Sequence, residues 1–400
     1  MSVQKIELNF LLNRMKRWQS LSVVEDQYLI RDLDEAIRNN RRKTQLPWLL
    51  QQGYLRVFDD VLEYPVPAGY DELAYIENSK ANSVYAQSAR FRFTSLQQFY
   101  ENLDYRNDIA EIRDSNDVFL GVRYKPTNIY SQVLNNAEDE SDWTVSDDAD
   151  SVVNENVIYK KGNGSVRVNI TNSTGTATIK NTFTYLTDEN YKKKYHFKLV
   201  YLSAVPTSIT MRFQVDDSNY LETTGITTQF SGQPLKAGAW NLIAQDLNTA
   251  TAVGTISTAS VWSSEKVILL GAATGTYYFD ESNLREWELM DFWYYSKYSV
   301  ALIGSTVANQ EYFYNSSDVY STDSSLIGDS EWIDVIMYDA MLTALADVKA
   351  TENINFIVSK RKEAFDQLTK AYPSMKPLVI TSRWRFTTDF NNDENYEDAN

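Results

Sequence analysis

The sequence contains no cysteine and only one histidine, His196, among its 400 residues. Without a thiol, the chain can form no disulfide, no thiolate nucleophile and no cysteine-ligated zinc site. With one imidazole, any Ser-His-Asp triad would have to use His196, and a metal site with several histidine ligands is excluded. Glycine-rich phosphate-binding motifs are absent as well. From these absences we expect a protein that is not an enzyme.

Basic residues are in the minority, since 38 Lys and Arg stand against 54 Asp and Glu and give a net charge of −16. Sequence-specific nucleic-acid binding needs a basic face, so we expect none, although an acidic wall could line a channel through which DNA slides. No run of about 18 consecutive apolar residues occurs, and the first residues have no apolar signal core. We therefore expect neither a membrane span nor a secretory signal.

Aromatic residues, by contrast, are abundant, with 27 Tyr, 17 Phe and 9 Trp. Tyr and Trp bury a large area while keeping a polar group, and they are enriched at protein interfaces. The composition fits a chain with extensive interaction surfaces, and it fits a β-rich domain with an aromatic core equally well.

Apolar residues recur at helical spacing near both ends of the sequence. Neither end has enough helices to bury its own apolar stripes, so we expect the helices of the two ends to pack together. Alternating segments at 84–93 and 118–124 predict a small antiparallel sheet beside them. The four helical stripes span residues 6–18, 22–42, 333–348 and 355–372.

Between residues 135 and 289 the sequence is rich in Thr, Ser and Asn, and short alternating runs replace the helical periodicity. Short strands separated by turn signals are typical of a β-sandwich, here most naturally a jelly roll. The expected strands are 165–171, 177–184, 195–202, 208–215, 227–230, 240–246, 266–272 and 275–280.

Together these patterns predict an α+β multidomain fold, in which a helical domain with a small antiparallel sheet is interrupted by an all-β jelly-roll sandwich. The sandwich is an insertion whose ends are expected to lie close together. We expect a C-terminal strand at 378–386 and an acidic tail at 391–400. The predicted domains are residues 1–134 and 290–400, which form the helical domain, and the inserted 135–289.

Three stretches resemble the head-to-tail adaptors of tailed bacteriophages, the tail-tubular-A-like ring proteins below the portal. The resemblance implies a helical adaptor domain in a structural virion protein, assembled in the host cytoplasm, that forms a connector ring of twelve copies at the neck. The implied partners are the portal protein, tail or nozzle proteins and fibre proteins. Genome DNA would pass through the lumen of the ring without sequence-specific binding. The motifs are Leu46-Pro47-Trp48-Leu49, Glu63-Tyr64-Pro65-Val66-Pro67-Ala68-Gly69-Tyr70-Asp71 and Ile327-Gly328-Asp329-Ser330-Glu331-Trp332-Ile333-Asp334.

A typical adaptor lacks the insertion at 135–289, which itself resembles jelly-roll carbohydrate-binding modules. The motifs are Gly164-Ser165-Val166-Arg167-Val168, Gly238-Ala239-Trp240 and Tyr277-Tyr278-Phe279-Asp280-Glu281. In such modules an aspartate at the place of Asp280 often helps to hold a structural calcium, an ion that oxygen ligands suit. The resemblance therefore implies a calcium cofactor at Asp280. The alternative is that Asp280 faces solvent or caps a turn.

Three aromatic residues of the insertion, Trp240, Trp262 and Tyr220, are candidates for stacking on sugar rings. The alternative is that each of them fills the sandwich core. If they bind sugars, the chain is a glycan-binding virion or surface protein, and this is the alternative to the connector role. A further alternative is a carboxylate glycosidase, whose most visible candidate pair is Asp216-Asp217. We interpret this doublet as part of a hairpin turn.

Overall fold

The computed structural model describes residues 3–41, 46–78, 92–101, 108–114, 117–124, 130–172, 175–305, 309–314, 320, 323–350 and 354–372. No helix within these ranges is long and apolar enough to cross a bilayer. The strand predicted at 378–386 and the acidic tail predicted at 391–400 lie outside the described residues, as does most of the strand predicted at 84–93.

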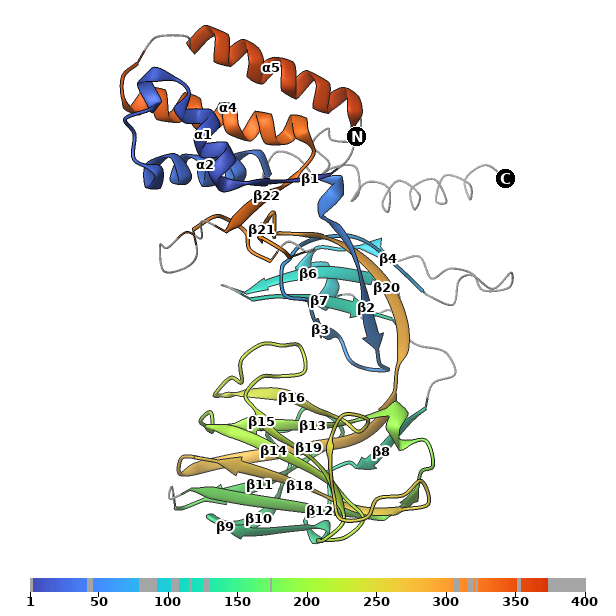
Figure 1. The fold of residues 1–400 in the computed structure, drawn as a ribbon. Coiled ribbons are helices and arrows are strands. Elements are labelled where there is room, and N and C mark those ends of the chain that lie inside the picture. Colours follow the sequence, from blue (N-terminus) through green and yellow to red (C-terminus); the bar gives the residue numbers. More distant parts are fainter. Residues whose placement is uncertain are drawn as a thin grey trace, which may run out of the picture. The chain divides into compact units, whose positions relative to one another are not determined.

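The chain divides into two compact units, whose elements are labelled in Figure 1. Unit 1 comprises Met1–Tyr54, Pro67–Asn78 and Asp291–Asn400, and unit 2 comprises Leu55–Val66 and Ser79–Met290. The predicted domain 1–134 is therefore shared between the two units.

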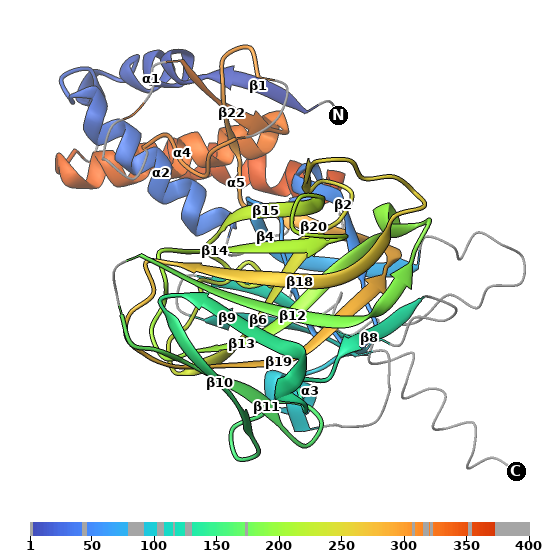
Figure 2. The ribbon, with the colours of Figure 1, turned by 90° about the horizontal axis from the view of Figure 1, so that it is seen from below.

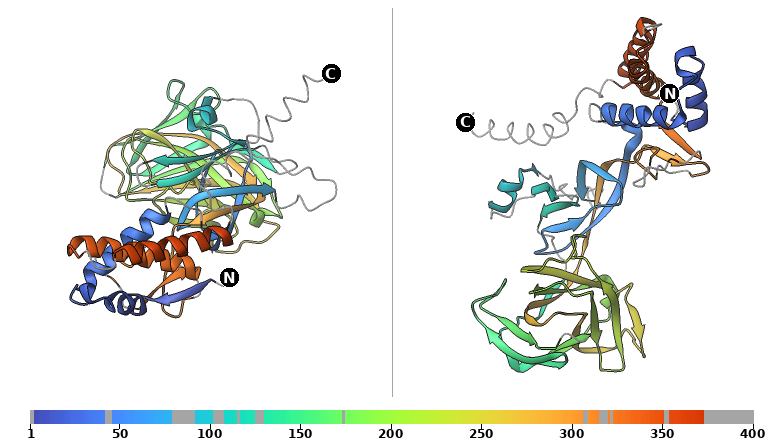
Figure 3. Two further views of the ribbon diagram at one scale, coloured as in Figure 1. Left: turned by 90° about the horizontal axis from the view of Figure 1, so that it is seen from above. Right: turned by 90° about the vertical axis from the view of Figure 1, so that its left-hand side faces the viewer.

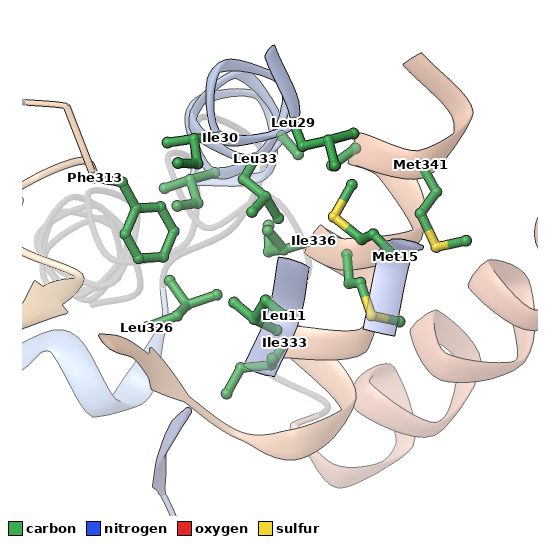
Figure 4. Packing of buried hydrophobic residues seen from close by; sticks show 14 of the residues in the cluster. Leu11, Met15, Leu29, Ile30, Leu33, Phe313, Leu326, Ile333, Ile336 and Met341 are labelled. Atoms are coloured by element: carbon green, nitrogen blue, oxygen red, sulfur yellow. The ribbon is translucent and has the colours of Figure 1, made fainter. Parts of the chain in front are cut away.

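Unit 1 is built around a hydrophobic core to which four helices contribute. Figures 1 and 3 show the blue N-terminal helices beside the orange and red C-terminal ones. In Figure 4, Leu11, Met15 and Leu33 from the N-terminal helices surround Ile336 from the C-terminal pair. The prediction that helices from the two ends pack together is confirmed. The helices are α1 (Leu8–Lys16), α2 (Asp26–Arg41), α4 (Ser330–Asp347) and α5 (Ile354–Ala371).

Polar and charged side chains at the edge of this core connect the helices. Asn40 of α2 donates a hydrogen bond to Asp339 Oδ2 of α4 at 2.7 Å, and Arg361 of α5 pairs with the same carboxylate. Arg14 of α1 lies 2.5 Å from Asp334 of α4. One carboxylate, Asp339, thus links three helices.

Unit 1 also contains two small sheets. The first has the order β1 (Gln4–Glu7), β22 (Ser324–Gly328) and β21 (Val300–Leu302), and its strands are antiparallel. The second has the order β2 (Leu50–Val57), β20 (Glu288–Ser296) and β4 (Tyr70–Asn78). The boundaries between the units at Tyr54 and Met290 fall within β2 and β20.

Unit 2 contains a β-sandwich of two antiparallel sheets, so the predicted jelly-roll sandwich is confirmed. The β13 sheet has the order β10 (Ala149–Glu155), β11 (Ser165–Ile170), β19 (Gly275–Glu286), β13 (Lys194–Leu202) and β16 (Ala239–Asp246), with β8 (Ser131–Asn135) also on β19. The β18 sheet has the order β17 (Thr251–Val253), β15 (Tyr220–Ile226), β14 (Ser208–Gln214), β18 (Val261–Leu270), β12 (Thr176–Thr187) and β9 (Trp143–Asp147). Figure 2 shows β14, β18 and β12 side by side.

A smaller sheet completes unit 2. Its order is β3 (Glu63–Pro65), β7 (Asp117–Arg123), β6 (Asp108–Asp114) and β5 (Arg92–Phe93), and the short helix α3 (Leu96–Glu101) follows β5. The predicted strand at 118–124 corresponds to β7. Its partner β6 is antiparallel to it, and β5 runs parallel to β6.

The predicted fold class, a helical adaptor domain interrupted by one β domain, is wrong. The chain is mostly β, and antiparallel sheets occur in both units. Strand β20 shows why, because its residues alternate strictly between buried and partly exposed along Glu288–Ser296. This alternation is the period of a strand, and it lies just past the end of the predicted sandwich, where no strand was expected.

Candidate ligand-binding site

The outward face of the β13 sheet carries a concentration of aromatic side chains. Successive residues of a strand point to opposite faces of its sheet. Lys198 contacts Glu265 of the β18 sheet and therefore points into the sandwich. The outward face of β13 consequently carries Tyr195, Phe197, Leu199 and Tyr201.

The segment Leu55–Val66 of unit 2 covers this face near the start of β13. The centroid of the Phe58 ring lies 4.9 Å from those of Tyr195 and Phe197. Arg56 donates hydrogen bonds to the Tyr195 hydroxyl at 2.5 Å and to Asp246 Oδ2 at 3.0 Å. Because these contacts bury Phe58 and Phe197 completely or nearly so, the segment is a structural part of unit 2.

Near the other end of β13, three aromatic rings form a row across three adjacent strands. Tyr201 pairs in register with Trp240 of β16 on one side and with Tyr278 of β19 on the other. The ring centroid of Tyr201 lies 5.7 Å from that of Trp240 and 5.4 Å from that of Tyr278, at interplanar angles of 71° and 81°. All three side chains are partly exposed. This aromatic row is therefore in part accessible to solvent.

A cavity of about 350 Å³ lies beside the aromatic row and shares Trp240 with it. Its wall combines apolar side chains of the sheet with polar and charged groups of the loops and of the covering segment. The lining residues are Asp60, Val61, Leu62, Glu63, Tyr100, Lys160, Lys161, Leu199, Gln229, Ser231, Trp240, Leu242, Asn283 and Arg285.

Two charged groups of the cavity wall, Lys161 and Asp60, form an ion pair. Lys161 pairs with Asp60 and lies 3.5 Å from Glu281, and burial lowers the pKa of its ammonium group. Tyr100 donates a hydrogen bond to Glu63 Oε1 at 2.7 Å, and burial, reinforced by this carboxylate, raises the pKa of its hydroxyl. At neutral pH the phenol of Tyr100 is therefore neutral and donates its proton to the hydrogen bond with Glu63.

Within the described residues, two buried polar atoms of the cavity wall, the Ser231 hydroxyl and Arg285 Nε, lack a hydrogen-bond partner. The hydroxyl of Ser231 is buried, and within the described part of the chain it makes no hydrogen bond. A buried hydroxyl without a partner is unfavourable, and a bound molecule could satisfy it. The cavity thus offers a hydroxyl, paired charges and an indole ring to a polar ligand.

The structure separates the three aromatic residues proposed from the sequence. Trp240 lies in the aromatic row. Trp262 is completely buried and stacks on Phe213 with 4.6 Å between ring centroids, so it has no face to offer a sugar. Tyr220 belongs to the β18 sheet and lies beside Arg212, whose guanidinium carbon is 4.5 Å from its ring centroid.

Sequence reasoning missed Tyr201 and Tyr278 as site residues. The signal that could have found them is strand register, because both align with Trp240 when β16, β13 and β19 are placed side by side. Alternation within each strand was visible in the sequence, whereas the register between strands far apart in the chain was not.

Asp280, the proposed calcium ligand, is completely buried rather than facing solvent. Its Oδ2 accepts hydrogen bonds from the backbone N–H groups of Lys160 and Lys161 at 2.6 and 2.9 Å, and its Oδ1 accepts one from Glu281. Hydrogen-bond donors thus point at both oxygens, an arrangement that does not suit a cation. No group of three acidic or histidine side chains able to hold a metal occurs in the described residues. The calcium cofactor stays an untested prediction.

The doublet Asp216-Asp217 lies in the turn between β14 and β15. Asp216 accepts hydrogen bonds from the Asn219 side chain and from the backbone N–H groups of Ser218 and Asn219, and these hydrogen bonds lower the pKa of its carboxyl. Lys266 and Lys180 lower the pKa of Asp217 in the same way. A glycosidase acid needs a raised pKa, so the doublet fits the hairpin-turn interpretation.

No protein-family model matches the chain, and no curated protein matches it. Among solved structures, the family 11 carbohydrate-binding module from Clostridium thermocellum, in complex with a β-1,3-1,4-mixed-linked tetrasaccharide, is 14% identical with a TM-score of 0.28. That match covers 38% of this chain and 94% of the module. A xylan-binding domain from family 22 is 15% identical with a TM-score of 0.27, over 41% of this chain and 97% of that one.

The enzymatically active domain of tailspike protein 4 from bacteriophage CBA120 also matches. It is 14% identical with a TM-score of 0.25, over 36% of this chain and 20% of that one. None of these three structures is a head-to-tail adaptor. The connector, ring, portal and virion expectations gain no support from them and stay predictions.

Proposed function

We propose that unit 2 is a carbohydrate-binding module and that a glycan chain binds along the outward face of the β13 sheet. The observation that supports this most directly is the aromatic row, in which Trp240, Tyr201 and Tyr278 are held in register on three adjacent strands. Sugar rings have apolar C–H faces that stack on aromatic rings, while their hydroxyls need polar partners. Tyr and Trp supply both.

The cavity beside Trp240 supplies the rest of the recognition chemistry. Ligand sites combine apolar walls with a few polar groups that fix orientation. Leu199 and Leu242 provide such a wall, and the unpartnered hydroxyl of Ser231 is available within it. The aromatic row would bind successive sugar rings along the glycan, and the cavity would bind one sugar unit or branch.

The test is glycan binding by the full chain, screened on a glycan array and then measured by calorimetry. Trp240→Ala is expected to weaken binding at least about fivefold, because truncating an aromatic anchor of a binding site costs more than about 1 kcal/mol. Tyr201→Phe, which keeps the ring and removes only the hydroxyl, is expected to change binding less than Tyr201→Ala.

Tyr220→Ala is the matched control, since Tyr220 is a partly exposed aromatic residue of the opposite sheet. It is expected to leave binding unchanged. The proposal fails if no glycan binds the full chain, or if Tyr220→Ala weakens binding as much as Trp240→Ala does.

A further inference from the structure

A cluster of polar side chains is buried in the interior of the sandwich, on the opposite side of the β13 sheet from its outward face. Lys198 and Asn181 both contact Glu265, and His196 and Ser282 complete the group. All five are at most 1% exposed. Burying charges in a protein core is costly, and a cluster of this kind calls for an explanation beyond ordinary packing.

The cluster is assembled from the two sheets that face each other. Asn181 of β12 and Glu265 of β18 are paired in register on one sheet, and Lys198 of β13 and Ser282 of β19 are paired on the other. Glu265 Oε1 lies 2.9 Å from Lys198 Nζ and 3.0 Å from Asn181 Nδ2. The amine of one sheet and the amide of the other therefore meet at a single carboxylate oxygen.

The other oxygen of Glu265 is held in place. Oε2 accepts a hydrogen bond from the Ser282 hydroxyl at 2.5 Å and also contacts His196 Nε2. With Oε2 anchored by these two side chains, Oε1 is fixed between Lys198 and Asn181.

The environment of the Lys198 amine shifts it towards its neutral form. Burial lowers its pKa, and the attraction of Glu265, Asp280 and Glu281 opposes this only in part. Nζ lies 4.3 Å from the centroid of the Trp143 ring and makes no hydrogen bond of good geometry, and Asn181 Oδ1 is also without a partner. A desolvated lysine amine of this kind is a nucleophile.

We propose that Lys198 and Asn181 become joined by an isopeptide bond between Nζ and Cγ, which cross-links the two sheets covalently, with Glu265 as the general base. The ammonium of Lys198 first gives a proton transiently to Glu265 Oε1, although the charges of Lys198 and His196 lower the pKa of this carboxyl. The neutral amine then attacks Asn181 Cγ and forms the C–N bond. The amide nitrogen Nδ2 takes protons from Nζ and from Oε1, and it leaves as ammonium while the Cγ–Nδ2 bond breaks.

This step balances without an oxidant or any other reactant, because one lysine ammonium and one carboxamide give one secondary amide and one ammonium ion. Glu265 ends as the carboxylate with which it began.

The test is the intact mass of the purified full chain, measured after unfolding. We expect a mass lower than that of the sequence by one ammonia, and a branched tryptic peptide in which the segment of Lys198 is joined to the segment of Asn181. An intact mass equal to that of the sequence in folded, aged protein would overturn the proposal, and this measurement needs no variant.

Variants separate the roles of the three residues. Asn181→Ala and Glu265→Gln are expected to restore the full mass of their own sequences. Asn181→Asp is expected to lose water instead of ammonia and to give the same linked product as the unchanged chain. Lys194→Arg is the matched control, because Lys194 is a buried, ion-paired lysine of the same strand, and it is expected to keep the ammonia loss. Loss of ammonia in Asn181→Ala would contradict the assignment.

Discussion

At the scale of single residues, Asp32 on α2 shows how burial turns a helix carboxylate into a pH-sensitive group. Burial raises the pKa of Asp32 to about 6, and the nearby charges of Asp347 and Glu35 add to the rise. Its side chain is only half-buried, so solvent screens part of the effect. Burial also raises the pKa of Asp34 to about 6, although the N–H groups of Phe313 and Tyr314 oppose this.

The sign of the effect on stability follows from proton binding. Between about pH 4 and pH 6 the folded chain keeps a proton on Asp32 that the unfolded chain has lost, so the free energy of unfolding falls as the pH rises through this window. We expect Asp32→Asn to be more stable than the unchanged chain by about 1 kcal/mol at pH 7, after discounting for screening, and equally stable near pH 3.5.

Thermal melts followed by the circular dichroism of the helices would measure this difference at both pH values. Asp366→Asn on α5, an exposed carboxylate, serves as the control and should show no such dependence. An equal effect of Asp32→Asn at both pH values would contradict the argument.

At the residue level, the structure places Trp240 on the outward face of its sheet and Trp262 in the core, although both occupy strands with similar alternation. Which face of a strand points inward depends on the sheet that covers it, and this information is not local. The cavity is another example, because Asp60 and Glu63 reach it from a segment far from Trp240 in the sequence.

At the scale of elements, helices were predicted more closely than strands. Residues 333–348 and 355–372 were expected, and α4 (Ser330–Asp347) and α5 (Ile354–Ala371) match them, because the helical period is a local property. Most sandwich strands were also found. The run predicted at 227–230 is instead a loop with an isolated bridge between Thr228 and Pro234, since a short alternating run does not determine whether a neighbouring strand is available.

The start of α4 gives a prediction at this scale. Asp329 caps the helix by accepting a hydrogen bond from the Glu331 N–H at 3.1 Å, and its other oxygen accepts one from the Tyr372 hydroxyl at 3.2 Å. We expect Asp329→Ala to lower the free energy of unfolding by about 1 to 2 kcal/mol. The reason is that the helix cap and the hydrogen bond from Tyr372 are both lost. Chemical denaturation would measure it.

Asp329→Ser tests the origin of the loss. Serine retains a capping oxygen, so it should recover most of the stability while leaving Tyr372 without its acceptor. If serine and alanine destabilise the chain equally, capping is not the cause.

At the scale of the whole molecule, the division into units does not follow the order of the sequence. Leu55–Val66 packs with the rest of unit 2 through Phe58, although residues 67–130 separate it from the first strand of the sandwich at Ser131. Composition marked the sandwich at 135–289 because its Thr- and Ser-rich strands differ from their surroundings. Composition could not identify the short segment Leu55–Val66 as part of the same unit, because its role depends on contacts with the rings of Tyr195 and Phe197.

This packing predicts that the sandwich alone is incomplete. A fragment of residues 130–290 lacks Phe58 and exposes the rings of Tyr195 and Phe197. We expect Phe58→Ala in the full chain to cost about 3 kcal/mol or more, and we expect the fragment to melt lower than the same fragment with a synthetic peptide of residues 55–66. A peptide with Phe58→Ser is the control. A fragment whose melting temperature does not respond to the peptide would contradict the prediction.

The interleaving of the two units also sets an order for events on the ribosome. The chain passes between the units at Tyr54, Val66, Asn78 and Met290, so α1 and α2 emerge long before α4 and α5 exist to cover them. The sandwich has all of its strands once Glu286 has been made, whereas the helical core must wait until the last helix is synthesised. The apolar faces of the nascent helices α1 and α2 therefore stay uncovered during most of translation. We expect chaperones to bind them during this time.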